Sequence, residues 1–583
     1  MIINSGGNLI SDQAITVSGA FSMTGTAIYT HNNISNAAVT IFSGAESFSA
    51  TSTLVIDKWS SFTTPLPNGV TGNFGNLTFN TTGSWSQNGL FAPNRIKGTL
   101  AITNGSIIMD NGTGMSTSLT LQDVAISGSG CLVVQSGTPR NLTLITGNFT
   151  DVSTSTNYTY MMYRSVGNFD WTVNGNLNVN HRFTAIEGTS AANVGSAVIH
   201  VTGDFTIGGG LFTGLKQVTG SINMTVDGAS LITGGPSLVA FKDYYIGDVT
   251  FNSGSLAIDN SRNTYFLGTH STVGAVTINI TGDFSISGAS TRVYYAVNDA
   301  SFNDIFVTIG NDLILTDALL SATNGGIVNY SIGRNYTQTG ATSNFRGQYS
   351  SVNAGNVDMT INGSMTINGG LFTQSRTTGS VSLNVTEVID VQNATFYGMN
   401  NTTLGNNGIG TLSCTDLSIS ASTFDFYRGV VLDGRTIPIN ISNQLSINFT
   451  NAAQRVYFIS RAGDNNAVLD LNIGTNFYVT GTADGLFCSS MSTGMEDISI
   501  GNDFSVSGGR ARFNAFENAS ARGHTTTGSV GGSVLLSGGS IAFSSHVGTT
   551  NWTITGDFDQ TGGIQFANGI QVLLISMYWV ILA

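Results

Sequence analysis

Acidic side chains recur at one position of a repeated sequence pattern and are the first candidates for chemistry in this chain. They stand at the corner between two short apolar segments, at Asp204, Asp283, Asp312, Asp503 and Asp557. Carboxylates on successive repeats could supply ligands to calcium, but this ion takes about six to eight oxygen atoms. Each repeat offers one carboxylate, and several repeats carry Asn or Ser instead. The pattern therefore favours carboxylates that cap turns, and no metal site is expected.

A denser group of charged residues between Asp425 and His524 raises the question of an enzyme. Glycoside hydrolysis needs two carboxyl groups about 5 to 9.5 Å apart. The charged residues here are spread over several repeats at different phases: Asp425, Arg428, Asp433, Arg435, Arg461, Asp464 and Asp484. No nucleophile, base and orienting acid recur together. We therefore assign no catalytic residue and expect no cofactor; a polysaccharide-active lyase or glycoside hydrolase is the alternative function.

Arginine and tyrosine form the third group of candidates. The chain has only 20 Lys and Arg residues, yet cations recur at one phase of the repeat, with aromatic residues at or near the same phase. Arginine offers a planar fork to carboxylate or sulfate groups, and tyrosine offers a flat face to sugar rings. Acidic glycans are the ligands that this pattern indicates. The competing interpretation is that the tyrosines belong to the core and the arginines cover its edge. The predicted ligand-binding residues are Arg376, Arg428, Arg455, Tyr427 and Tyr457.

Short strands in a long repeat must position all of these residues. In the stretch VIHVTGDFTIGGGLF (198–212), Val201, Phe205 and Ile207 share one face of a pleated strand. Residues equivalent to Phe205 recur roughly 23 to 32 residues apart, without helical or six-residue periodicity. The sequence predicts an all-β fold, a right-handed parallel β-helix with about 27 residues per coil. Its anchors are Phe149, Leu177, Phe205, Phe284, Leu313, Met365, Ile389, Leu445, Phe477, Phe504 and Phe558.

Three segments follow from the spacing of the repeat. Residues 1–140 are expected to form irregular N-terminal β coils or a cap, 141–570 the regular β-helix, and 571–583 an apolar tail of uncertain status. The tail is shorter than the roughly 20 residues that a helix needs to cross a bilayer, so no integral membrane span is expected. Three interpretations are open: a membrane-associated stub, a last strand that needs a partner, or the product of a truncated or frameshifted reading frame, which we favour because no polar cap follows the run. The first residues lack the charged and apolar regions of a secretory signal.

Composition argues against several classes of function. Charged residues are 9% of the chain and the net charge is −13 without a basic run, so nucleic acid is not an expected partner. The three cysteines are too few and too far apart for a disulfide framework or a zinc site, and are expected to be buried. The pair Gly369-Gly370 opens no helix, which indicates a bend rather than a phosphate loop.

The units VTGDFTIGGG, ITGDFSISG and INGSMTINGG resemble those of long, repeat-built surface and secreted proteins of bacteria. Such proteins include adhesin-like β-helices, some of them exported by the type IX route. The resemblance covers about residues 140–570. It implies a non-catalytic structural or adhesive rod, located outside the cell or on its outer surface. Acidic glycans and components of the cell surface or matrix are the implied partners.

Overall fold

The computed structural model describes residues 1–12, 17, 19–32, 46–58, 75–86, 96–110, 118–137, 140–164, 167–190, 192–234, 238–243, 246–268, 274–297, 304–322, 326–349, 355–401, 407–431, 433–460, 466–491, 493–513, 524–543 and 548–566. The expected tail at 571–583 lies outside these residues. Contacts divide the chain into two compact units. Unit 1 is Met1–Ile280 with Ala296–Asn298, and unit 2 is Thr281–Tyr295 with Asp299–Ala583.

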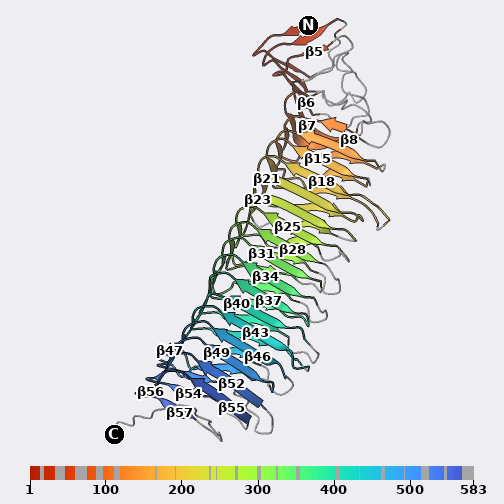
Figure 1. The fold of residues 1–583 in the computed structure, drawn as a ribbon. Helices are drawn as coiled ribbons and strands as arrows, with labels where there is room; N and C mark the ends of the chain where they lie inside the picture. Colours follow the sequence, from red (N-terminus) through yellow and green to blue (C-terminus); the bar gives the residue numbers. More distant parts are fainter. Residues whose placement is uncertain are drawn as a thin grey trace. The chain divides into compact units, whose positions relative to one another are not determined.

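Each regular coil contributes three short strands, here named first, second and third in chain order. In unit 1 one coil consists of β18 (Ala197–Val201), β19 (Phe205–Ile207) and β20 (Leu211–Lys216). In unit 2 one coil consists of β34 (Val357–Ile361), β35 (Met365–Asn368) and β36 (Leu371–Ser375). Each strand pairs in parallel with its counterparts on the neighbouring coils. Figure 1 shows the first strands of unit 2, β28 to β43, as successive parallel arrows.

The neighbouring coils are built from strands with the following bounds. In unit 1 they are β12 (Leu142–Thr146), β13 (Phe149–Asp151), β14 (Thr159–Tyr163), β15 (Phe169–Val173), β16 (Leu177–Val179), β17 (Arg182–Glu187), β21 (Ile222–Ile232) and β23 (Val249–Asp259). In unit 2 they are β26 (Phe284–Ser287), β28 (Ile305–Ile309), β29 (Leu313–Thr316), β31 (Val328–Ile332), β32 (Tyr336–Thr339), β33 (Asn344–Gln348), β37 (Val381–Val385), β38 (Val388–Gln392), β39 (Thr395–Asn400), β40 (Gly410–Cys414), β41 (Asp416–Ser420), β42 (Thr423–Arg428), β43 (Thr436–Ile441), β44 (Leu445–Phe449) and β45 (Arg455–Ile459). Near the N-terminus, β1 (Ile2–Ile3), β3 (Phe21–Met23) and β5 (Glu46–Phe48) form a separate three-stranded sheet.

The fold is the parallel β-helix that the sequence predicted, with about 27 residues per coil and no helix among the described residues. The described part of the chain accordingly holds no helical segment of the length and apolarity needed to cross a membrane. All three cysteines are buried, as expected.

The anchors stack in register on the second strands. Phe149 lies beside Leu177 and Leu177 beside Phe205 in unit 1. In unit 2 one column runs without a slip from Phe284 on β26 to Phe558 on β56 (Phe558–Gln560). Phe205, Phe284 and Phe504 are fully buried. Since a slip of one residue would turn each apolar face outward, this burial confirms the predicted alignment.

In both units, some anchor positions hold residues that the sequence pattern did not reveal. Ser230 occupies the position beside Phe205, and its Oγ lies 2.7 Å from the Oγ of Ser253. A buried hydroxyl is tolerated there because it has a hydrogen-bond partner. In unit 2 the additional anchors are Tyr336, Leu417 and Val534.

Phenylalanines on the third strands of unit 2 form a second buried column. Phe345, Phe372, Phe396 and Phe424 are paired in register on four successive coils. Their ring centres are 4.8, 4.9 and 4.5 Å apart, and neighbouring rings are within 10° of parallel. The ring spacing follows the separation of about 4.7 to 4.9 Å between neighbouring strands. Replacing one ring therefore leaves a gap between two others.

We expect Phe396→Ala to lower the free energy of unfolding by about 3–5 kcal/mol, because Phe396 is fully buried between two parallel rings. Phe306→Ala is the matched control: this ring is 38% exposed on β28, and its loss should change stability by less than about 1 kcal/mol. Denaturant unfolding of both variants measures the difference. Equal effects would contradict the assigned register.

Candidate functional site

The acidic corner residues cap the backbone of the next coil. Oδ1 of Asn176 accepts a hydrogen bond from the N–H of Asp204 at 2.9 Å, and Oδ1 of Asp204 accepts one from the N–H of Ala229 at 2.9 Å. In unit 2 the same bond joins the N–H of Asn335 to Asp312, of Ser364 to Asn335, and of Ser533 to Asp503. The interpretation as turn caps is thus confirmed for Asp204, Asp312 and Asp503. Within the described ranges, no three His, Cys, Asp or Glu residues are grouped so that they could hold a metal ion.

The predicted arginines do not meet at one edge of unit 2. Arg376 directly follows β36 and Arg428 ends β42, so both lie at the carboxyl ends of third strands, and both are exposed. Arg455 instead begins β45, where its Nη1 donates to the carbonyls of Ala452 and Gln454. The connection before β45 is longer than the two-residue bend before β36, which shifts Arg455 to the opposite end of its strand.

The two predicted tyrosines differ in exposure. Tyr427 is fully buried, and its hydroxyl donates to the carbonyl of Gly408 at 2.7 Å. Burial raises the pKa of its phenol. Tyr457 is half-buried and packs against Leu486 and Cys488. Tyr427 is therefore a core residue, and only Tyr457 of the pair offers part of its ring to solvent.

The charge-rich segment resolves into local pairs. Asp433 lies 2.7 Å from Nε of Arg435, and Asp484 lies 3.1 Å from Nε of Arg510. These pairs are part-exposed contacts of the kind that contribute about 0–1 kcal/mol each. Arg461 and Asp464 lie outside the described residues.

Asp425 has the most unusual environment of the segment. Its side chain is only 5% exposed, it is paired in register between Tyr397 and Tyr457, and its Oδ1 has no hydrogen-bond partner within the described part of the chain. Burial raises the pKa of Asp425 to about 7, although a hydrogen bond with Ser460 and the guanidinium of Arg428 act in the opposite direction. Burying the charged form is costly, so the neutral acid is favoured up to about neutral pH.

A buried histidine and aspartate lie close together in unit 1. Nδ1 of His181 is 3.3 Å from Asp151, and its Nε2 is 2.9 Å from the carbonyl of Ser155. Burial lowers the pKa of His181, but the hydrogen bond and charge of Asp151 outweigh it, and the net pKa is raised. Because both ring nitrogens face acceptors, the doubly protonated imidazolium is favoured, and this form has no lone pair with which to act as a base. The pair therefore joins two coils and does not form a catalytic dyad.

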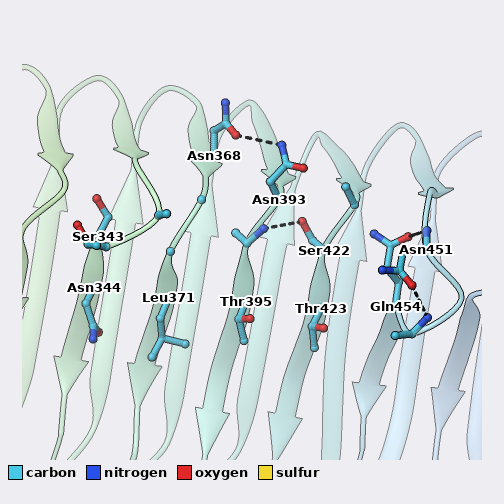
Figure 2. Close-up of a pocket in the computed structure, with 17 residues that line it drawn as sticks. Ser343, Asn344, Asn368, Leu371, Asn393, Thr395, Ser422, Thr423, Asn451 and Gln454 are labelled. Atoms are coloured by element: carbon cyan, nitrogen blue, oxygen red, sulfur yellow. Dashed lines mark hydrogen bonds between the residues drawn. The ribbon is translucent and has the colours of Figure 1, made fainter.

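A groove of about 750 Å³ crosses five successive coils of unit 2 (Figure 2). It runs along the bends that follow the second strands β32, β35, β38, β41 and β44. Its lining contains amides, hydroxyls, small side chains and the larger apolar side chain of Leu371, and no charged residue. The labelled polar residues include Asn344, Asn368, Asn393, Thr395 and Thr423. The sequence interpretation identified Gly369-Gly370 as a bend but did not identify the groove.

Small residues at the bends keep the groove open. Gly369, Gly370, Asn393 and Ala421 all have a positive φ, between 50° and 104°. A Cβ at Gly370 would lie 2.1 Å from the carbonyl oxygen of Ser343, so no larger residue fits there. Small residues at a constant phase after each second strand were the sequence feature that could have revealed this surface.

Part of the polar lining is already engaged, and part is available to a ligand. Asn393 donates to Oδ1 of Asn368 at 3.3 Å, and Ser422 accepts the N–H of Ala394 at 3.1 Å. The hydroxyls of Thr395 and Thr423, stacked in register, have no partner among the described residues. The groove can thus offer a column of uncharged donors and acceptors.

Comparison with models of protein families, with curated proteins and with solved structures found no match for this chain. A proposal for its function therefore depends on the geometry of its own residues.

For the corner caps, we expect Asp204→Ala to lower the free energy of unfolding by about 1 kcal/mol, because the N–H of Ala229 loses its acceptor. Asp204→Asn keeps an oxygen in place and should be nearly neutral. Thermal unfolding with and without calcium tests both points. Stabilisation by calcium in the parent protein but not in the Asn variant would contradict the capping role.

For Asp425, stability should fall as pH rises from about 4 to about 7, because the folded-state pKa of about 7 lies above the unfolded value of 3.8. Asp425→Asn removes this dependence. The variant should gain up to about 4 kcal/mol relative to the parent between pH 4 and pH 8. Urea unfolding at both pH values measures this change. A difference that is independent of pH would contradict the raised pKa.

Proposed function

We propose that this protein is a non-catalytic, glycan-binding β-helix that serves as a structural or adhesive element on the outer surface of a bacterial cell or in its secreted fraction. The observation that carries the proposal is the uncharged polar groove across five coils of unit 2 (Figure 2). The resemblance of its repeats to those of adhesin-like surface proteins supports the location.

The lining favours an uncharged polysaccharide as the occupant of this groove. Sugar hydroxyls donate and accept hydrogen bonds, which matches hydroxyls such as those of Thr395 and Thr423. Neighbouring strands are about 4.7–4.9 Å apart, so similar contacts recur along the groove. An extended polymer can use several of them at once, and weak contacts then add up through multivalency.

The chemistry of the site argues against the alternative, a lyase or glycoside hydrolase. No carboxyl group lines the groove. The carboxylates at Asp433 and Asp484 have arginine partners, and Asp425 is buried. A general acid and base must reach the scissile bond, and none of these groups lies in the groove lining.

We expect the protein to bind a soluble neutral polysaccharide, such as a mixed-linkage β-glucan, without shortening it. Thr395→Trp and Thr423→Trp place bulky rings on the lining and should each weaken binding about tenfold or more. Thr308→Trp is the control, because Thr308 is exposed on a first strand of the same unit and lies outside the groove. Affinity electrophoresis measures binding, and an assay of reducing ends measures cleavage.

Two results would contradict the proposal. Equal binding by the parent and both groove variants would show that the groove is not the site. An increase in reducing ends with time would show an enzyme, and its loss in Asp425→Asn would locate the catalytic acid.

A further inference from the structure

A row of tyrosines lies beside the third strands of unit 1. Tyr158 precedes β14, and Tyr160 and Tyr163 belong to it. The ring centres of Tyr158 and Tyr160 are 5.5 Å apart, and those of Tyr160 and Tyr163 are 4.5 Å apart. All three side chains are half-buried, so each leaves part of its surface to solvent. The rings of this tyrosine platform lie largely face to face, so a ligand can reach only the parts of each ring that are left exposed.

Three cations lie against this platform. The guanidinium of Arg182 and the ammonium of Lys216 are 5.4 and 5.6 Å from the ring centre of Tyr158, and the guanidinium of Arg164 is 5.0 Å from that of Tyr163. These distances are within the range of cation–π attraction. Lys216 also pairs with Glu187 at 3.3 Å. Three positive charges and one negative charge thus meet on one surface.

Among the described residues, no carboxylate neutralises the two arginines. Arg164 and Arg182 are exposed, and in the described ranges neither forms an ion pair with a carboxylate. Within the part of the chain that the structure describes, the hydrogen bond of Arg182 goes to the carbonyl of Thr156, at 3.2 Å. The chain has 33 acidic residues and 20 Lys and Arg residues, so carboxylates are not scarce. Cations that lie over aromatic rings and have no carboxylate partner are preorganised to bind an external anion.

A similar arrangement occurs in unit 2. The guanidinium groups of Arg346 and Arg376 lie 4.3 and 4.6 Å from the ring centre of Tyr349, and Arg376 donates to the Tyr349 hydroxyl. Neither arginine pairs with a carboxylate within the described residues. The combination of one tyrosine with two cations is therefore not confined to one coil.

We propose that the surface formed by Tyr158, Tyr160, Tyr163, Arg164 and Arg182 binds an acidic saccharide, an oligomer with carboxylate or sulfate groups. Its acidic groups would accept paired hydrogen bonds from the guanidinium forks, and its sugar rings would contact the exposed parts of the tyrosines. The inference shares with the proposed function only the ligand class, glycans. It concerns other residues, in another unit, and a charged ligand.

Titration calorimetry of the full chain at low ionic strength tests this proposal. The probes are a galacturonic acid hexamer, which supplies carboxylates, a sulfated dextran oligomer, and maltohexaose as the neutral control. Arg182→Gln should weaken binding of the acidic probe by about tenfold, the effect of one lost charged hydrogen bond. Arg262→Gln is the matched control, because Arg262 is exposed in the same unit, contacts none of the tyrosines and carries the same charge.

A second variant protects the test against misfolding. Arg164 has a φ of 51°, so Arg164→Gly removes the guanidinium without straining the backbone. The proposal is supported if either acidic probe binds more weakly to Arg182→Gln or Arg164→Gly than to the parent, while its binding to Arg262→Gln is unchanged. The probe that binds identifies the acidic group. Absence of binding by both acidic probes, or equal weakening in all three variants, overturns it. Neutral polysaccharide binding at the groove of unit 2 is judged separately by Thr395→Trp.

Discussion

The pairing of each strand with the same strand of the next coil is the constraint on which the rest of the structure depends. Parallel pairing satisfies the strand backbone between coils, and the corner side chains continue it where the chain turns. Asn176 and Asp204 both use an oxygen for the backbone of the following coil. Short polar side chains serve this purpose well. This explains why Asn, Ser, Thr and Gly are common in a chain in which only 9% of residues are charged.

The same constraint shapes the groove of unit 2. Stacking places equivalent residues in columns, so that Thr395 and Thr423 lie side by side and Phe372 lies beside Phe396. A catalytic site needs different groups converging on one point, whereas a column offers similar groups at regular spacing. The groove of unit 2 offers similar groups at regular spacing in this way (Figure 2). Such a surface suits an extended, repetitive ligand better than a small substrate.

The sequence predicted the parts of the fold that depend on alternation. Phe205, Phe284 and Phe504 could be assigned to the core because every second residue around them is apolar. Ser230 could not, because a hydroxyl can occupy an anchor position only through a partner on another coil. Arg455 was misjudged relative to Arg376, because distance from the anchor does not reveal a longer bend. The groove, and the approach of Arg182 and Lys216 to Tyr158, depend on contacts between coils, which a single repeat does not show.

Removal of one coil tests the central claim most directly, namely that stability depends on in-register pairing between neighbours. Deleting residues 365–388 brings Ile389 to the place of Met365 beside Tyr336, so every column stays in register. Deleting 365–389 removes one residue more and reverses the apolar alternation of the next strand. The account predicts that the first variant unfolds cooperatively near the melting temperature of the parent and that the second does not fold at that coil. Equal loss of structure in both variants, measured by circular dichroism and hydrogen exchange, would contradict it.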